Sequence, residues 1–556
     1  MLTEDITKRF YLVKTMNYEI FLKLSIFVQI KNSMKTKLSL LFILISFFAF
    51  SQMEEKKLDE LIQNTLKTFD VPGISVGIIK DGKVVYSKGF GVRSLTNNQK
   101  MTDETLVGIA SNSKGFTATA LAMLADEGKL KFDDKVSKYI PEFQMHDAYV
   151  SQEVTIKDLI THRAGLGLGQ GDLMFFPEGG PLTVNDIIHN VRYLKPENSF
   201  RSNLDYNNIM FIVAGEVIHR VSGLSWAEFM EQRILKPVGM TSSYGSYNRA
   251  KAANVPNIID AHAPVDGKVV AVPHDWNETG NAAGGIISNI RDMNTWAEFL
   301  MNGFTTKDGK KLVTDKQIQQ LWNLQISTPV ALKNPYDTNF NGYGLGWFVT
   351  DVKGHKQVYH TGGLIGTVTQ FTLIPDMKLG IVVLTNQQSG AAFSAITNTI
   401  KDSYLGVADR NWLKTYGERM SKVNAEYAKG KKEIFAKSDA FKKDKNSQIK
   451  SEQIVGTYTD QWFGDVTISK EGNSFRIFCK NSPRLKGELL PYSPNVMIAK
   501  WDDRSYDADA FVNFNLDENG KAEGMKLKPI SDITDFSFDF EDLDLQRTKY
   551  TECFKK

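Results

Sequence analysis

Apolar and polar residues alternate in stretches near both ends of the first 410 residues. A stretch over residues 74–78 precedes Asp81-Gly82, a dipeptide typical of type I′ turns, and a second stretch covers 84–86. Two further apolar stretches, 368–374 and 381–384, flank a turn that begins with Pro-Asp. Both patterns predict β-hairpins, and helical patterns lie between them. We therefore expect one sheet assembled from segments far apart in the sequence.

The rest of the chain after residue 410 shows two other patterns. Residues 411–450 are rich in Lys with few apolar positions, which predicts a solvated, largely helical linker. Residues 451–556 alternate short apolar segments with turns such as Glu471-Gly472-Asn473, which predicts a small all-β barrel or sandwich. The expected strands of this barrel lie at 456–458, 466–468, 475–478, 496–499 and 511–514.

The N-terminus has the three parts of a cleavable export signal at residues 34–51. A short basic segment is followed by an apolar run over 38–50 and a small-residue exit at Ser51. Residues 1–33 are expected to be a mis-assigned start. The alternative is an uncleaved anchor, but the apolar run is shorter than the roughly 20 residues that a span needs. We expect a periplasmic or secreted protein with no stable membrane span after signal cleavage.

Composition and charge exclude several classes of function. The chain has 556 residues with 42% hydrophobic and 24% charged residues, an ordinary globular composition. Its net charge is +3, and no block of Lys and Arg interleaves with aromatics, so no nucleic-acid partner is expected. Cys479 and Cys553 form no metal or redox motif, and the eight His residues are scattered singly. We expect neither a metal nor an organic cofactor.

The most informative motif is a serine followed three residues later by a lysine. Ser111 follows the strand-like segment 106–110 and opens a helical pattern over 115–130 whose apolar spacing predicts one buried face. One helical turn brings the amine of Lys114 to the serine, and a desolvated lysine can activate a serine nucleophile. The same spacing recurs at 447–450 in the charged linker, without a strand before it or a buried helix after it.

Seven segments between about residues 60 and 400, the first of which contains Ser111 and Lys114, match the motifs of one protein family in the same order. They are 107–118, 127–143, 154–166, 204–218, 283–285, 343–347 and 360–363. With them the chain resembles the penicillin-recognising serine hydrolases, specifically their class C β-lactamase-related branch.

This resemblance implies an α+β domain over residues 53–410. It is expected to have an antiparallel sheet flanked by helices, a largely helical subdomain between about 115 and 290, and the active site in the cleft between them. Residues 451–556 resemble the lipocalin-like barrel often appended to this branch, where it shapes access to the site or builds oligomers. The sequence therefore leaves open whether the protein forms a homo-oligomer.

The resemblance also assigns roles near the nucleophile. Tyr206 and Asn208 match the family's Y-x-N motif, which faces the serine. Either Lys114 or Tyr206 takes the proton of Ser111, and the two can titrate as a unit. Asn208 is expected to orient Lys114 and to hydrogen-bond the substrate's acyl amide. In the family pattern, the position of His162 is structural.

The third motif is His360-Thr361-Gly362 on a predicted strand beside the site. Gly362 is expected to let the substrate's backbone approach closely, and the N–H of Gly363 is expected to join that of Ser111 as the oxyanion hole. The family more often carries Lys where this chain has His360, and a histidine is largely neutral at pH 7. This departure favours peptidases, amidases and esterases over β-lactamases.

The sequence therefore predicts an exported serine hydrolase that cleaves an amide or ester, in a peptide, D-aminoacyl or small ester substrate, through a Ser111 acyl-enzyme. One alternative is a β-lactamase or penicillin-binding protein that acylates with slow turnover. Another is a non-catalytic protein whose barrel binds a ligand. Selectivity is expected in the loops 165–181 and 328–340, which match no pattern.

Overall fold

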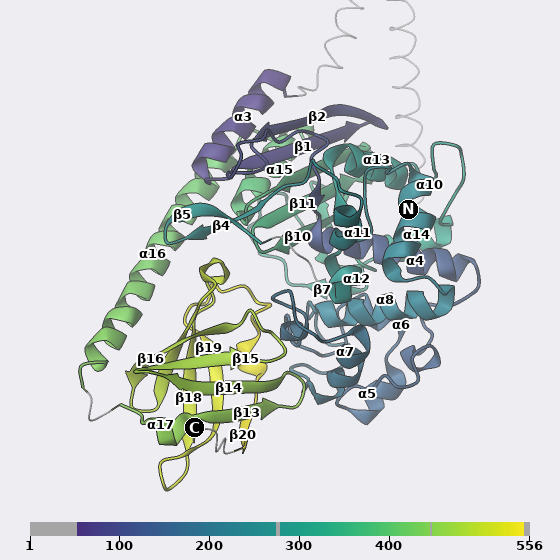
Figure 1. Cartoon of the computed structure of the whole chain (residues 1–556). Helices are drawn as coiled ribbons and strands as arrows, with labels where there is room; N and C mark the ends of the chain where they lie inside the picture. The colour runs from purple at the N-terminus through teal and green to yellow at the C-terminus, as the bar shows by residue number, and fades with distance from the viewer. Residues whose placement is uncertain (1–52, 274–277, 445–447, 550–556) are drawn as a thin grey trace, which may run out of the picture. The chain divides into compact units, whose positions relative to one another are not determined.

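The computed structural model describes residues 53–273, 278–444 and 448–549 (Figure 1). The predicted export signal at 34–51 and the extension at 1–33 lie outside these residues. Glu54–Lys401 and the described residues from Asp409 onward belong to one compact unit, which contains every site and cavity residue discussed below.

The larger domain is built on one eight-stranded antiparallel sheet in the order β2-β1-β12-β11-β10-β9-β8-β7. Its strands are β1 (Gly73–Lys80), β2 (Lys83–Gly91), β7 (Ile326–Thr328), β8 (Asn341–Tyr343), β9 (Phe348–Val352), β10 (His355–Leu364), β11 (Thr367–Ile374) and β12 (Leu379–Thr385). Both predicted hairpins are confirmed. Asp81 and Gly82 have φ of 53° and 73°, as a type I′ turn requires. Because β1 pairs with β12, the first hairpin and the last close one sheet.

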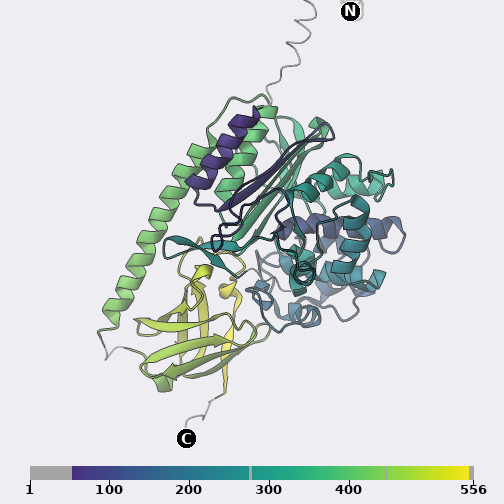
Figure 2. The ribbon, with the colours of Figure 1, turned by 45° about the horizontal axis from the view of Figure 1, so that its top comes forward.

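Helices from distant parts of the chain cover this sheet. The helix α13 (Ile290–Met301) packs against β1 and β12, and α3 (Glu55–Thr68) packs against β2. The helix α15 (Gly390–Tyr404) follows β12. Figure 2 shows α3, in purple, beside the long light-green helix α16 (Trp412–Phe441), with which it is in contact.

The helix after the nucleophile differs from its prediction at its end and on its faces. A 3-10 turn, η1 (Ala110–Asn112), leads into α4 (Ser113–Asp126), which stops four residues earlier than expected. Gly128 has a φ of 71° and forms the left-handed residue that commonly ends a helix. Every residue of α4 from 113 to 124 is buried, rather than one face. Three helices pack around it: α8 (Asn208–Ser222), α12 (Asn281–Gly284) and α14 (Asp315–Trp322).

The segment between α4 and α13 is largely helical, as the family resemblance implied. Its helices are α5 (Ala148–Glu153), α6 (Ile156–Leu159), α7 (Val184–Asn190), α8 (Asn208–Ser222), α9 (Trp226–Phe229), α10 (Lys236–Val238), α11 (Tyr247–Ala252) and α12 (Asn281–Gly284). A hairpin of β4 (Ala261–Val265) and β5 (Lys268–Val272) interrupts them, and β3 (Val107–Gly108) pairs with β6 (Ile287–Ser288). In the described part of the chain no single helix meets the length and hydropathy of a membrane span, whereas the bent pair Asn208–Ser222 and Trp226–Val238 meets them together.

The C-terminal region is a closed eight-stranded barrel, which confirms the predicted all-β domain. After α16 and the short α17 (Ser451–Ile454), its strands are β13 (Gly456–Asp460), β14 (Gly464–Glu471), β15 (Ser474–Cys479), β16 (Lys486–Ser493), β17 (Val496–Trp501), β18 (Ala510–Leu516), β19 (Ala522–Pro529) and β20 (Leu545–Lys549). The sequence pattern missed three of them: β16, β19 and β20. Their inward positions include small residues such as Ala522 and Gly524, so apolar alternation is weak there.

Candidate active site

The serine of the S-x-x-K motif lies in a strained turn that two strands hold in place. Ala110, directly before Ser111, has a φ of 50°, a left-handed conformation that costs a non-glycine residue energy. The hydroxyl of Thr369 on β11 donates to the carbonyl of Ile109 at 2.9 Å and accepts from the side chain of Asn112 at 2.8 Å. The turn that presents Ser111 is therefore fastened to the sheet on both sides.

Gly362 lies directly against this turn, where a side chain would not fit. A Cβ atom at Gly362 would lie 2.3 Å from the carbonyl oxygen of Ile109 and 2.9 Å from the Cβ of Ala110. Gly362 is buried and does not line the cavity described below. The close approach that the structure shows at Gly362 is to the nucleophile turn, and the approach of the substrate's backbone stays a prediction.

Lys114 is fully buried, with 0% of its surface exposed, and its amine lies beside the serine. Its Nζ donates to the Oγ of Ser111 at 3.0 Å, to the Oδ1 of Asn208 at 2.6 Å and to the carbonyl of Ala283 at 3.0 Å. It also lies 4.8 Å from the ring centre of Tyr206. The predicted contact between serine and amine is thus present, with Asn208 orienting the amine.

Burial lowers the pKa of Lys114 to about 7, although the charge of Asp172 opposes the shift. A substantial fraction of the amine is therefore neutral near pH 7. Burial raises the pKa of the Tyr206 phenol, and a hydrogen bond with Ser111 offsets this only in part. Tyr206 therefore carries its proton at the pH where Lys114 is able to accept one.

His162 holds the segment that carries Tyr206. The backbone N–H of Asn207 donates to His162 Nδ1 at 3.1 Å, and the N–H of Asp205 donates to the carbonyl of His162 at 2.8 Å. The rings of His162 and Tyr206 lie 4.3 Å apart. Burial lowers the pKa of His162 well below its usual value, so it is neutral and packs as an aromatic ring. These contacts agree with a structural position for His162.

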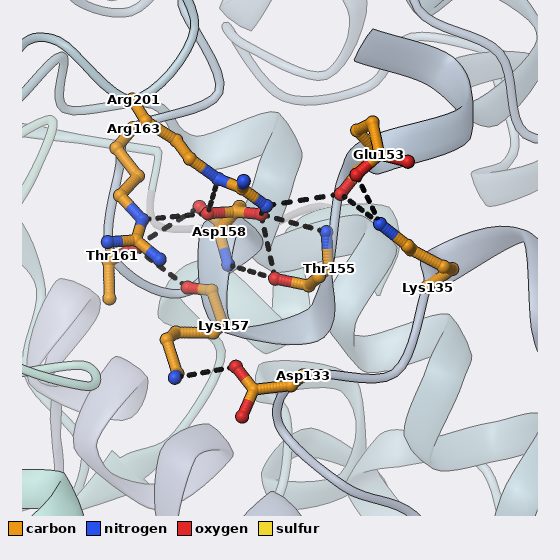
Figure 3. A network of polar contacts seen from close by, with 9 residues as sticks. All are labelled: Asp133, Lys135, Glu153, Thr155, Lys157, Asp158, Thr161, Arg163 and Arg201. Carbon is orange, nitrogen blue, oxygen red and sulfur yellow. Dashed lines mark hydrogen bonds and ion pairs between the residues drawn. The ribbon is translucent and has the colours of Figure 1, made fainter. Parts of the chain in front are cut away.

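A buried carboxylate anchors the chain just before His162 (Figure 3). Asp158 has no exposed surface, yet it accepts from Arg163 Nε at 2.7 Å and from Arg201 Nη2 at 2.6 Å. It also closes the capping box of α6 with Thr155. Burial alone would raise the pKa of Asp158, but the hydrogen bonds from Arg201 and Thr155 outweigh it and hold the pKa low.

His360, on β10, lies between a tyrosine and its own strand. Its Nδ1 lies 2.6 Å from the carbonyl of Thr361, which is able only to accept, so Nδ1 carries the proton. Nε2 then accepts from the hydroxyl of Tyr343 at 2.9 Å. Burial, with a smaller contribution from Lys114, lowers the pKa of His360 to about 3. His360 is therefore neutral and carries no charge with which to hold a carboxylate.

A second buried acid, which sequence reasoning missed, lies behind Asn208. Asp172 on the turn η3 (Asp172–Met174) accepts from Asn208 Nδ2 at 2.8 Å, and from the hydroxyl of Ser537 at 2.8 Å. Burial raises the pKa of Asp172 to about 7, against those two hydrogen bonds. Ser537 belongs to the barrel, in the loop between β19 and β20 (residues 530–544, the β19–β20 loop). A chain of hydrogen bonds thus links the barrel to Lys114.

The β19–β20 loop makes further contacts with the segment that carries Asp172. The N–H of Gly171 donates to the carboxylate of Asp539, and Gln170 Nε2 donates to Asp542 at 3.2 Å. The rings of Phe536 and Tyr206 lie 6.1 Å apart, edge to face. No motif marks the residues of this loop, which follow Ser111 by more than 400 positions. Nothing in the sequence would have placed them here.

Ser111 opens into a cavity of about 390 Å³. Of the predicted site residues, Ser111, Tyr206, Asn208, His360, Thr361 and Gly363 line it, and Lys114 reaches it through Ser111. The loop 165–181 contributes Leu168, Phe175 and Phe176, whereas no residue of the loop 328–340 lines it. The barrel residues Asp535, Phe536 and Ser537 also line the cavity, and the role of both loops in selectivity stays a prediction.

The described residues contain no group of three or more His, Cys, Asp or Glu side chains that could hold a metal ion. Cys479, one of the two cysteines, is free and buried in the barrel, and burial raises its pKa.

Comparison with known proteins places this site in a family. Residues 58–405 match the beta-lactamase family, and the chain belongs to that family. Residues 442–547 match a domain of unknown function, DUF3471, which covers the barrel. Membership of the class C branch stays a prediction.

Two relatives and one solved structure show the extent of the likeness. The unguisins hydrolase ungD' of Aspergillus campestris is 28% identical over 394 residues, 68% of this chain and 70% of its own length. Protein flp of Staphylococcus aureus (strain NCTC 8325 / PS 47) is 27% identical over 341 residues, 60% of this chain and 64% of its own length. The octameric penicillin-binding protein homologue from Pyrococcus abyssi shares the fold, with a TM-score of 0.58 and 23% identity over 89% of this chain and all of that chain.

Proposed function

We propose that this protein is an exported serine hydrolase that cleaves an amide or ester through an acyl-enzyme on Ser111. The observation that carries the proposal is the buried Lys114 amine, 3.0 Å from the Ser111 hydroxyl and with a pKa lowered to about 7. A serine becomes a nucleophile at neutral pH when such a base lies beside it. The name of a hydrolase among the relatives supports the same class of reaction.

In this mechanism Lys114 is the base and Tyr206 the proton donor. Neutral Lys114 takes the proton of Ser111 as Oγ attacks the carbonyl carbon, which forms the C–O bond and moves charge to the carbonyl oxygen. The Tyr206 phenol, protonated because burial raises its pKa, donates to the leaving nitrogen or oxygen as that bond breaks. Lys114 then returns its proton to Tyr206, with which it is in contact.

The oxyanion is held by the backbone N–H groups of Ser111 and Gly363. Both residues line the same cavity, and Gly363 is exposed to it at the end of β10. Such donors are worth about 3 to 4 kcal/mol of barrier each. Water then attacks the acyl-enzyme by the same proton path in reverse, which regenerates Ser111.

Slow turnover by a β-lactamase or penicillin-binding protein is the second candidate, favoured by the match to the beta-lactamase family. The neutral His360 weighs against it, because a β-lactam carries a carboxylate that needs a cation. Export and a periplasmic or secreted location rest on the signal pattern at 34–51.

The test is labelling of the mature protein with a fluorophosphonate, followed by turnover of p-nitrophenyl esters, aminoacyl anilides and nitrocefin. Ser111→Ala is expected to abolish labelling. Ser113→Ala is the matched control, because the Ser113 hydroxyl accepts from the backbone N–H of Ile286 at 3.1 Å and lies outside the cavity. Labelling that persists in Ser111→Ala would refute the assignment, and labelling with no turnover would favour the second candidate.

A further inference from the structure

A second, larger cavity of about 750 Å³ adjoins the catalytic one. The two share four lining residues: Gly363, Leu364, Ile365 and Asp535. The second cavity is bounded by the end of β10, by residues of α16, and by the barrel residues 505–507 and 533–538. Its volume is that of a site for a ligand of several residues' length. A substrate bound at Ser111 therefore has room to continue past Gly363.

The charged residues that line the two cavities are all acidic. Among the described residues that line either cavity there is no Lys and no Arg, while Asp70, Asp507 and Asp535 are present. Asp507 is paired with Lys431 and accepts from Tyr427, so its charge is already compensated. Asp70 and Asp535 are both solvent-accessible and have no ion pair within the described part of the chain, although desolvation by its surroundings raises the pKa of the Asp535 carboxyl. The uncompensated charge of the joined cavities is negative.

A buried acceptor without a partner adds an independent observation. Gln387 lines the second cavity with only 5% of its surface exposed, and its Oε1 has no hydrogen-bond partner among the residues that the structure describes. A buried carbonyl oxygen left unpaired costs about 1 to 3 kcal/mol. Such an acceptor is satisfied by a ligand that brings N–H donors.

We infer that the substrate bears a positively charged amine or guanidinium arm that occupies the second cavity, between Asp535 and Asp70, and donates to Gln387. The inference rests on the proposed hydrolysis at Ser111 and names its substrate class as basic peptides or amine-bearing amides. Asp535 is a specificity-determining residue at the junction of the two cavities. A substrate that carries a carboxylate in this arm is rejected, because neither lining offers a cation.

The test uses three fluorophosphonates with tails of equal length that end in an ammonium, a neutral amide or a carboxylate. The rate of Ser111 labelling of the mature protein is expected to be about five-fold higher with the cationic than with the neutral tail, and lowest with the carboxylate. Added salt should reduce the difference, since the carboxylates are exposed. Asp535→Asn should remove most of it, while the asparagine keeps the turn in which Asp535 accepts from the N–H of Ser537 at 2.9 Å.

Asp532→Asn is the matched control, because Asp532 lies in the same loop, is exposed and lines neither cavity. It should keep the full preference for the cationic tail. Equal labelling by all three tails, faster labelling by the carboxylate, or an unchanged preference in Asp535→Asn would each overturn the inference and leave the proposed function standing. No labelling by any tail would overturn the proposed function and the inference with it.

Discussion

Two walls of the catalytic cavity differ in where their residues come from and in how they are held. One wall consists of the motif residues of the hydrolase domain, such as Ser111 and Tyr206, with Lys114 buried behind them and hydrogen-bonded in three directions. The other is the β19–β20 loop of the barrel, where the side chain of Phe536 is 40% exposed. In the proposed mechanism the first wall carries out bond cleavage, and in the proposed specificity the second contacts the substrate. These two proposals assign reaction and selection to separate parts of the chain.

The carboxylate of Asp172 is hydrogen-bonded to both walls. It accepts from Asn208 on the motif side and from Ser537 on the barrel side, each at 2.8 Å. Three substitutions test how independent the walls are, from the motif side to the barrel side.

The largest effect is expected for Lys114→Met, which removes the base and leaves an apolar side chain of similar length. We expect kcat/KM to fall by about 10³-fold, within the range that general-base catalysis supplies. In the native protein kcat/KM should rise as the pH increases through about 7, because Lys114 must lose its proton to act. The variant should lack that rise. A retained rise through pH 7 would show that another group is the base.

The second-largest effect is expected on folding stability, at a buried residue that supports the motif wall. Asp158→Asn leaves Arg163 and Arg201 without their buried carboxylate, and we expect a loss of about 3 kcal/mol of folding free energy. Because the pKa of Asp158 is held below its ordinary value, its stabilisation is present above about pH 4 and is lost as the pH falls. Thermal unfolding at pH 7 and at pH 3 measures both effects.

Asp133→Asn provides the control for this substitution. Asp133 also pairs with a cation, Lys157, at 2.6 Å, but 80% of its side chain is exposed, so its loss should cost less than about 1 kcal/mol. An equal fall in unfolding temperature for Asp133→Asn and Asp158→Asn would contradict the role of burial.

The smallest effect is expected for Ser537→Ala, which removes the hydrogen bond from the barrel to Asp172. Without this hydroxyl the carboxylate of Asp172 loses a donor, its pKa rises, and it stabilises the Lys114 ammonium less. The pKa of Lys114 then falls, so the rise of kcat/KM should move to lower pH by about half a unit, or ~0.7 kcal/mol. His162 and His360 stay neutral and do not compensate.

The matched control is Ser531→Ala, in the same loop but outside both cavities. It should leave the pH profile unchanged. A profile that does not move in Ser537→Ala, or that moves to higher pH, would mean that the barrel does not influence the base.

Prediction from sequence succeeded where a residue's environment is set by its near neighbours in the chain. Asp81-Gly82 predicted its hairpin turn because both residues tolerate a positive φ. The contact between Ser111 and Lys114 followed from the helical repeat alone. The end of α4 at Asp126 was missed although Gly128 signals it, because the apolar pattern continues to Leu130. The contact of Gly362 with the nucleophile turn was missed because a sequence does not show which backbone lies against a glycine.

The sequence by itself determined the class of fold, the order of the motifs and the identity of the serine, lysine, tyrosine and asparagine that meet at the site. Only the tertiary structure decided how buried Lys114 is, and therefore that its pKa falls to about 7. It alone placed Asp172 behind Asn208 and brought Asp535 and Ser537 to the cavity. The reason is physical: local spacing acts through a few covalent bonds, whereas burial and long-range contacts depend on how the whole chain packs.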